Sequence, residues 1–207
     1  MIRKEKILFE KWRKKRIGLI EDGVVDEEAY RNSKLKILYL LKEVNGITDT
    51  SWSLIQFLKD GGRPQTWNNI TRWTYGIRNL DKELLWEDLK EISEAKRKEY
   101  LKSICVVNTK KETGGNVTNI KELEEYRKED KELIKEQIEI YSPDLIICCG
   151  VNFVDETLKY SQTSRGIQYA KTNNRYIIKY WHPEARCGNN LLFYGLIDAL
   201  KEIGIEK

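Results

Sequence analysis

The chain has 207 residues, of which 34% are charged and 40% hydrophobic, and its formal net charge is +4. That length suits one domain with a sizeable core, and the three prolines and lack of a glycine- or serine-rich tract argue against a linker or a disordered tail. The longest apolar runs are far too short to span a membrane, and charged residues closely follow Met1, which is not the pattern of a secretory signal. We therefore expect a cytoplasmic monomer with no membrane partner.

The modest positive charge permits a polyanionic partner without requiring one. Its excess lies near the start of the chain, in Arg3, Lys4, Lys6, Lys11, Arg13, Lys14, Lys15 and Arg16. If this segment is a helix, Ile7, Leu8 and Trp12 face inward and the basic residues face outward, where they either contact phosphate or stay solvated. We expect one domain over residues 1–207, with residues 1–33 forming a helical extension packed on the rest.

Four short apolar runs, rich in branched residues, predict buried strands. They lie at residues 36–42, 103–108, 145–149 and 176–181, and a short edge strand is expected near 167–169. Helical spacing occurs at residues 50–59, 120–141 and 152–160 and from Asn189 or Asn190 to Ile203, and two or three helices are expected across 67–75 and 82–101. Residues 24–32 form a short connection or a small helix. This alternation predicts an α/β protein, a three-layer α/β/α fold around a central, mostly parallel four-stranded sheet.

Three polar side chains follow predicted strands directly. Glu43 comes after the first strand, Asn108 ends the second, and His182, the only histidine, comes after the last. Carboxyl ends of parallel strands meet at one edge of a sheet, which is where ligands bind in open α/β folds. A carboxylate, an amide and an imidazole are therefore expected to converge, although each residue taken alone also fits a helix cap, a loop or a solvated turn.

The sequence gives little support for metal or nucleotide cofactors. The four cysteines have no CxxC spacing, and one histidine without a carboxylate pair makes a poor metal site; we expect reduced, packed thiols at Cys105, Cys148, Cys149 and Cys187. The glycine patterns of phosphate loops and of dinucleotide-binding turns do not follow any predicted strand. We expect no metal and no cofactor.

In order and placement, these motifs resemble the uracil-DNA glycosylase superfamily, especially its branch with a GEAPG-like first motif. The resemblance covers roughly residues 36–203 and is carried by Lys42-Glu43-Val44-Asn45-Gly46, Val106-Val107-Asn108-Thr109-Lys110, residues 142–150 and Trp181-His182-Pro183-Glu184. It implies a parallel sheet flanked by helices and an enzyme of base excision repair. Such an enzyme flips a uracil or another damaged base out of DNA and cleaves its N-glycosidic bond.

The resemblance also implies roles for individual residues. Glu43 would orient the attacking water, His182 would donate a hydrogen bond to the departing base, and Asn108 would read the pyrimidine edge. Further contacts to the flipped base are expected from Asn45, Gln65 and Trp67, and contacts to DNA phosphates from Arg63, Lys110, Lys111 and Arg186.

The chain departs from the family pattern at several of these positions. Asn45 replaces a proline, Lys42 a small residue, Gln65 a base-stacking phenylalanine, and Glu184 a serine close to the DNA backbone; the cysteines that hold an iron–sulfur cluster are missing. Two alternatives therefore stay open. One is a catalytically altered nucleic-acid or nucleotide binding protein of the same fold, and the other is a hydrolase of a different nucleoside-like substrate.

Overall fold

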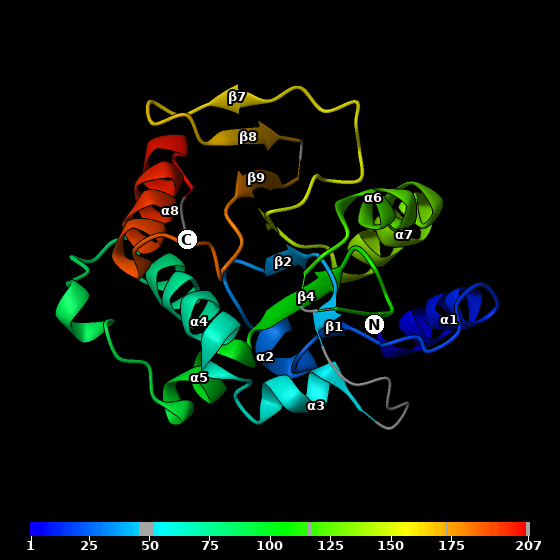
Figure 1. The fold of residues 1–207 in the computed structure, drawn as a ribbon. Helices are drawn as coiled ribbons and strands as arrows, with labels where there is room; N and C mark the ends of the chain where they lie inside the picture. Colours follow the sequence, from blue (N-terminus) through cyan, green and yellow to red (C-terminus); the bar gives the residue numbers. More distant parts are fainter. Residues whose placement is uncertain (46–51, 116, 173, 206–207) are drawn as a thin grey trace.

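A mostly parallel sheet forms the centre of the computed structural model, which describes residues 1–45, 52–115, 117–172 and 174–205. Within these ranges the main sheet has seven strands in the order β1-β4-β2-β6-β9-β8-β7, and β4, β2, β6 and β9 are parallel (Figure 1). The strands are β1 (Gly23–Val24), β2 (Ile37–Leu41), β4 (Ile104–Asn108), β6 (Leu145–Cys149), β7 (Ser161–Gln162), β8 (Gln168–Lys171) and β9 (Tyr176–Tyr180).

The four predicted strands are the parallel ones, but the expectation of a four-stranded sheet is wrong. β1 pairs antiparallel with β4 at one edge, and β8 and β7 extend the sheet antiparallel beyond β9 at the other. These edge strands lack the continuous apolar runs that mark strands buried on both faces: β1 has two residues, and both residues of β7 are exposed. The edge strand expected near 167–169 is β8.

Helices cover both faces of the sheet, which gives three layers (Figure 1). On one face lie α3 (Leu54–Lys59), α4 (Pro64–Arg78), α5 (Glu94–Leu101) and α8 (Asn189–Ile203), and on the other α1 (Ile2–Arg13), α2 (Glu27–Arg31), α6 (Ile120–Glu129) and α7 (Lys131–Tyr141). Alternate residues of β2 face the two helical layers. Tyr39 packs with α4 and α8, whereas Leu38 and Leu40 pack with α1 and α7.

Two of the predicted helices are wrong, and a third begins later than expected. Residues 152–160 form no helix, because the Asp155 carboxylate accepts hydrogen bonds from the Thr157 amide and hydroxyl and closes a local turn. The helix expected over 120–141 is two helices that meet at the buried Asp130. Where two or three helices are expected across 67–75 and 82–101, the structure has α4, a 3₁₀ turn (Trp86–Asp88) and α5. α3 begins at Leu54, and residues 50–51 lie outside the described residues.

The N-terminal segment packs closely against the sheet's second helical layer. Leu8, Phe9 and Trp12 of α1 are buried with residues of α7, and β1 extends the sheet. The expectation that Ile7 also faces inward is wrong, because it lies on the solvent side of the helix and is 55% exposed. Several basic side chains of this segment form ion pairs within the molecule, among them Lys11 with Glu136 at 2.7 Å. Among the described helices, none combines the length and apolar character needed to cross a bilayer.

Candidate active site at the strand ends

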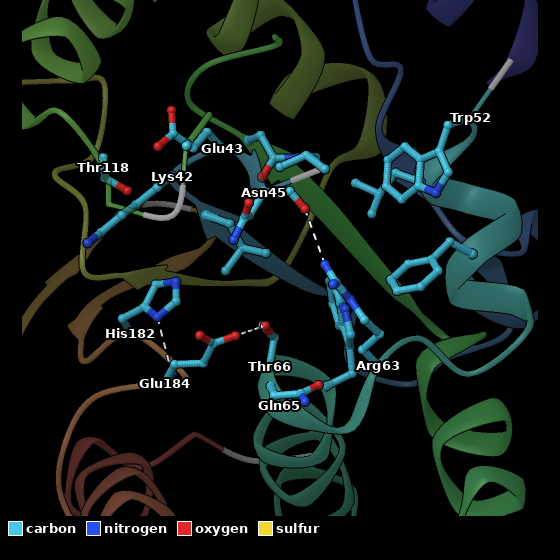
Figure 2. A pocket seen from close by; sticks show the side chains of 17 residues that line it. Lys42, Glu43, Asn45, Trp52, Arg63, Gln65, Thr66, Thr118, His182 and Glu184 are labelled. Carbon is cyan, nitrogen blue, oxygen red and sulfur yellow. Dashed lines mark hydrogen bonds between the residues drawn. The ribbon is translucent and has the colours of Figure 1, made fainter. Parts of the chain in front are cut away.

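A cavity of about 370 Å³ opens where β2 and β4 end, beside the segment that follows β9 (Figure 2). Side chains from all three strand ends contribute to it, so the structure brings Glu43, Asn108 and His182 together around one space. The full lining consists of Leu41, Lys42, Glu43, Val44, Asn45, Trp52, Leu54, Phe57, Arg63, Gln65, Thr66, Trp67, Asn108, Gly115, Thr118, His182 and Glu184.

Backbone pairing beyond the main strands fixes the position of Glu43. The amide of Lys110 donates to the carbonyl of Lys42 at 2.9 Å, and two short parallel strands follow, β3 (Val44–Asn45) and β5 (Thr113–Gly114). The Glu43 side chain lies directly against Gly114, where an added Cβ would stand 2.0 Å from the Glu43 Cδ atom. Only glycine at position 114 leaves room for the carboxyl group in this place.

The Glu43 carboxylate is buried and incompletely hydrogen-bonded. Its side chain is 6% exposed, and its Oε2 atom lies 3.6 Å from the Nζ atom of Lys110. Its Oε1 atom is buried without a hydrogen-bond partner among the described residues. A buried carboxylate oxygen of this kind is costly unless a water or a ligand donates to it, so the geometry favours a bound hydrogen-bond donor at this point.

The surroundings of His182 favour a neutral imidazole. The backbone amide of Glu184 donates to the Nδ1 atom of His182 at 3.2 Å. An accepting Nδ1 carries no proton, so the neutral ring has its hydrogen on Nε2. Burial lowers the pKa of His182, the positive charge of Lys42 lowers it further, and Glu184 opposes the shift. At neutral pH the side chain is therefore a neutral Nε2–H donor.

Contacts with α4 hold the loop that carries His182. The Asn69 amide donates to the Pro183 carbonyl at 2.7 Å and to the Asn189 side chain at 2.9 Å. The hydroxyl of Thr66, in the first turn of α4, donates to the Glu184 carboxylate (Figure 2). Negative charge is stabilised at a helix N-terminus, so the hydrogen bond from Thr66 holds the Glu184 carboxylate where the α4 dipole stabilises it.

Asn108 lines the cavity, and its side-chain amide has no hydrogen-bond partner among the described residues. Its side chain is almost fully buried, and its backbone amide donates to Asp22 at 2.6 Å. No described residue forms a hydrogen bond with its side-chain amide, which lines the cavity with one donor and one acceptor group. Such a group can pair with a ligand that carries a carbonyl beside an N–H.

The other residues predicted to contact the base also line the cavity. Trp67 is buried there, while Asn45 and Gln65 are exposed. Arg63 lies at the same opening and donates to the Asn45 carbonyl at 3.2 Å (Figure 2). The sequence predicted no role in this site for Phe57, Thr66 or Thr118. Lys42 was expected beside Glu43 only as a departure from the family pattern, and the structure places it in the cavity lining.

The expectation that Lys111 contacts DNA is wrong. Its side chain is fully buried, its ammonium group lies 2.8 Å from Asp22 Oδ1, and it donates to Gln137 at 2.7 Å. Lys110 is also largely enclosed and is paired with Glu122 at 2.5 Å. The loop turns inward because the Lys111 carbonyl accepts from the Ile20 amide. Arg186 is exposed outside the cavity lining, and its contact with DNA stays a prediction.

No known protein family or curated protein indicates a function for this chain, so the cavity is the main source of functional information. Comparison with protein-family models and with curated proteins finds no match for this sequence. Across the described ranges, no group of three or more His, Cys, Asp or Glu side chains is placed to hold a metal ion. The observations define an α/β protein with a polar cavity at the carboxyl edge of a mostly parallel sheet.

Proposed function

We propose that this protein is a uracil-DNA glycosylase-like hydrolase that binds a flipped uracil, or another damaged base of DNA, and cleaves its N-glycosidic bond. One observation carries the proposal: Glu43, Asn108 and His182 come from three separate strand ends and line one cavity. The volume of about 370 Å³ lies within the range of roughly 300–1,000 Å³ that is usual for small-molecule sites. A flipped base with part of its sugar fits such a space.

Cleavage of this bond separates charge, and two residues of the cavity lining suit the two charges. The departing base becomes negative while the sugar becomes positive. The Nε2–H of the neutral His182 would donate to the developing anion, an interaction that strengthens in the transition state and so accelerates the reaction. The Glu43 carboxylate would offset the positive sugar and orient the attacking water.

Recognition of the base would depend on Asn108 and on the aromatic side of the cavity. The side-chain amide of Asn108 can donate to a pyrimidine carbonyl and accept from the adjacent ring N–H, a pattern that uracil presents and cytosine does not. Trp52, Phe57 and Trp67 supply apolar surface for the ring. At the opening, Arg63 is the predicted phosphate contact that remains exposed beside the cavity.

An oligonucleotide assay tests this proposal. Single- and double-stranded DNA with one uracil is incubated with the protein, and alkaline cleavage of abasic sites reports base removal. We expect product with the parent protein and a loss of roughly 10²- to 10⁴-fold in Glu43→Gln and in His182→Gln. Glu87→Gln, at an exposed carboxylate outside the cavity, is the matched control. No product with the parent protein, or full product with both cavity variants, contradicts the proposal.

A second candidate is a protein of the same fold that binds DNA or a nucleotide without cleaving it. The observation that favours it is the position of Lys110, whose ammonium group lies beside the Glu43 carboxylate and partly offsets its negative charge. In that case the same oligonucleotides would bind without base loss, and the binding would weaken on raising the salt concentration. A binding measurement beside the cleavage assay separates the two candidates.

A further inference from the structure

Among the described residues, Lys42 is the only lysine that lines the cavity. It lies between the end of β2 and Glu43, and its carbonyl is held by the Lys110 amide. Its side chain passes Gly150, where an added Cβ would lie 3.5 Å from Lys42 Cε and 3.2 Å from His182 Cβ. Figure 2 shows this side chain on the same side of the cavity as the His182 ring.

The amine of Lys42 differs from its lysine neighbours in having no described partner. The ammonium groups of Lys110 and Lys111 are held by Glu122 and Asp22 at 2.5 and 2.8 Å. For Lys42, no described residue forms an ion pair or a hydrogen bond with the Nζ atom, and the side chain is partly buried. Lysine amines form imines with carbonyl compounds. An amine that lines a cavity and forms no ion pair with a described carboxylate is available for this reaction.

Removal of a base leaves an abasic sugar, whose ring-opened form carries an aldehyde at C1′. We propose that Lys42 forms an imine with this aldehyde, so that the site that releases the base also captures the abasic product; this step rests on the proposed function of the cavity. The ammonium group of Lys42 gives one proton to water and the amine nitrogen attacks C1′. The N–C1′ bond forms, and the carbonyl oxygen leaves as water with the two remaining amine hydrogens. Nothing is oxidised or reduced, and hydrolysis of the imine regenerates the lysine.

A purely electrostatic role is the competing explanation for Lys42. Its positive charge acts on His182, so a lysine that never reacts would still influence the site. An arginine at position 42 could perform the electrostatic role but not the covalent one. Arginine retains the charge beside His182 but cannot form the imine, so Lys42→Arg separates reaction from charge.

Borohydride trapping tests the proposal directly. The full-length protein is incubated with an oligonucleotide that already contains an abasic site, borohydride reduces any imine to a stable amine, and peptide mass spectrometry locates the cross-link. We expect a cross-link at Lys42, its loss in Lys42→Arg, and no change in Lys59→Arg, a variant of an exposed lysine at the end of α3 outside the cavity lining. Circular dichroism checks that each variant is folded.

The outcomes separate this inference from the proposed function, because the abasic site is supplied ready-made. No cross-link, a cross-link confined to other lysines, or an undiminished cross-link in folded Lys42→Arg overturns the inference even if uracil is released. A cross-link at Lys42 without uracil release upholds capture of the abasic sugar and counts against the glycosylase proposal alone.

Discussion

His182 owes its proposed role to a few contacts at the end of β9. The Glu184 amide selects the tautomer with hydrogen on Nε2, and burial keeps the ring neutral. Lys42 and Glu184 act on it with opposite charges, and the pKa of His182 is lowered overall. The neutral donor is therefore present above that lowered pKa and is lost as the pH falls through it.

Charge substitutions around His182 should move its pKa in opposite directions. Lys42→Met removes a positive neighbour and should raise the pKa, whereas Glu184→Gln removes a negative neighbour and should lower it. The chain has one histidine, so an NMR titration of the imidazole reads the shift without ambiguity. The acidic limb of the activity profile should follow the same order. Identical titrations in both variants would show that neither side chain acts on the ring.

At the scale of elements, the site depends on close contact between the ends of β6 and β9. Gly150 follows β6 with φ of 67°, and its amide donates to the Tyr180 carbonyl at 2.8 Å. The left-handed backbone and the nearby His182 Cβ both favour glycine at this position. The loop after β9 is held from the other side by Asn69 of α4. Two elements thus fix the histidine between them.

Gly150→Ala should affect stability and activity together. The left-handed conformation should cost about 1–2 kcal/mol of unfolding free energy, and the new Cβ should displace His182 and reduce activity. Gly166→Ala is a matched control, because Gly166 has φ of 80° and no atom lies within 4 Å of the place that its new methyl group would take. It should lose similar stability in denaturant unfolding and keep its activity. Equal activities of the two variants would contradict the contact at Gly150.

At the scale of the whole molecule, a buried polar cluster connects the N-terminal segment to the sheet and the second helical layer. Asp22 precedes β1, Lys111 follows β4, and Gln137 belongs to α7; their side chains form hydrogen bonds with one another. The Asp22 carboxylate also accepts from the backbone amide of Asn108. The cluster therefore holds the backbone of Asn108, one of the three cavity residues, in position.

Lys111→Met should destabilise the protein strongly. It leaves the Asp22 carboxylate buried without its cation, which should cost about 3–5 kcal/mol of unfolding free energy. Lys11→Met, which breaks an exposed pair with Glu136, should cost less than about 1 kcal/mol. Urea unfolding of both variants makes the comparison. Similar losses would mean that the buried cluster is not important for stability.

The sequence predicted the central strands because continuous apolar runs report burial on both faces of a sheet. It did not predict β7, whose two residues are exposed, because pairing of such a strand depends on β8 and not on its own composition. The positions of Glu43 and His182 followed from their places after strands. The burial of Lys111 could not be predicted in this way, because its partner Asp22 is 89 residues away in the sequence and only the folded chain brings them together.

Glu43 and His182 are proposed to act together in releasing a base from DNA. The most direct measurement is single-turnover release of free uracil from uracil-containing DNA, followed by mass spectrometry. We predict release by the parent protein and a rate lower by roughly 10²- to 10⁴-fold in Glu43→Gln, with folding unchanged. No free uracil from the parent protein, or an equal rate in the folded Glu43→Gln variant, would contradict this account.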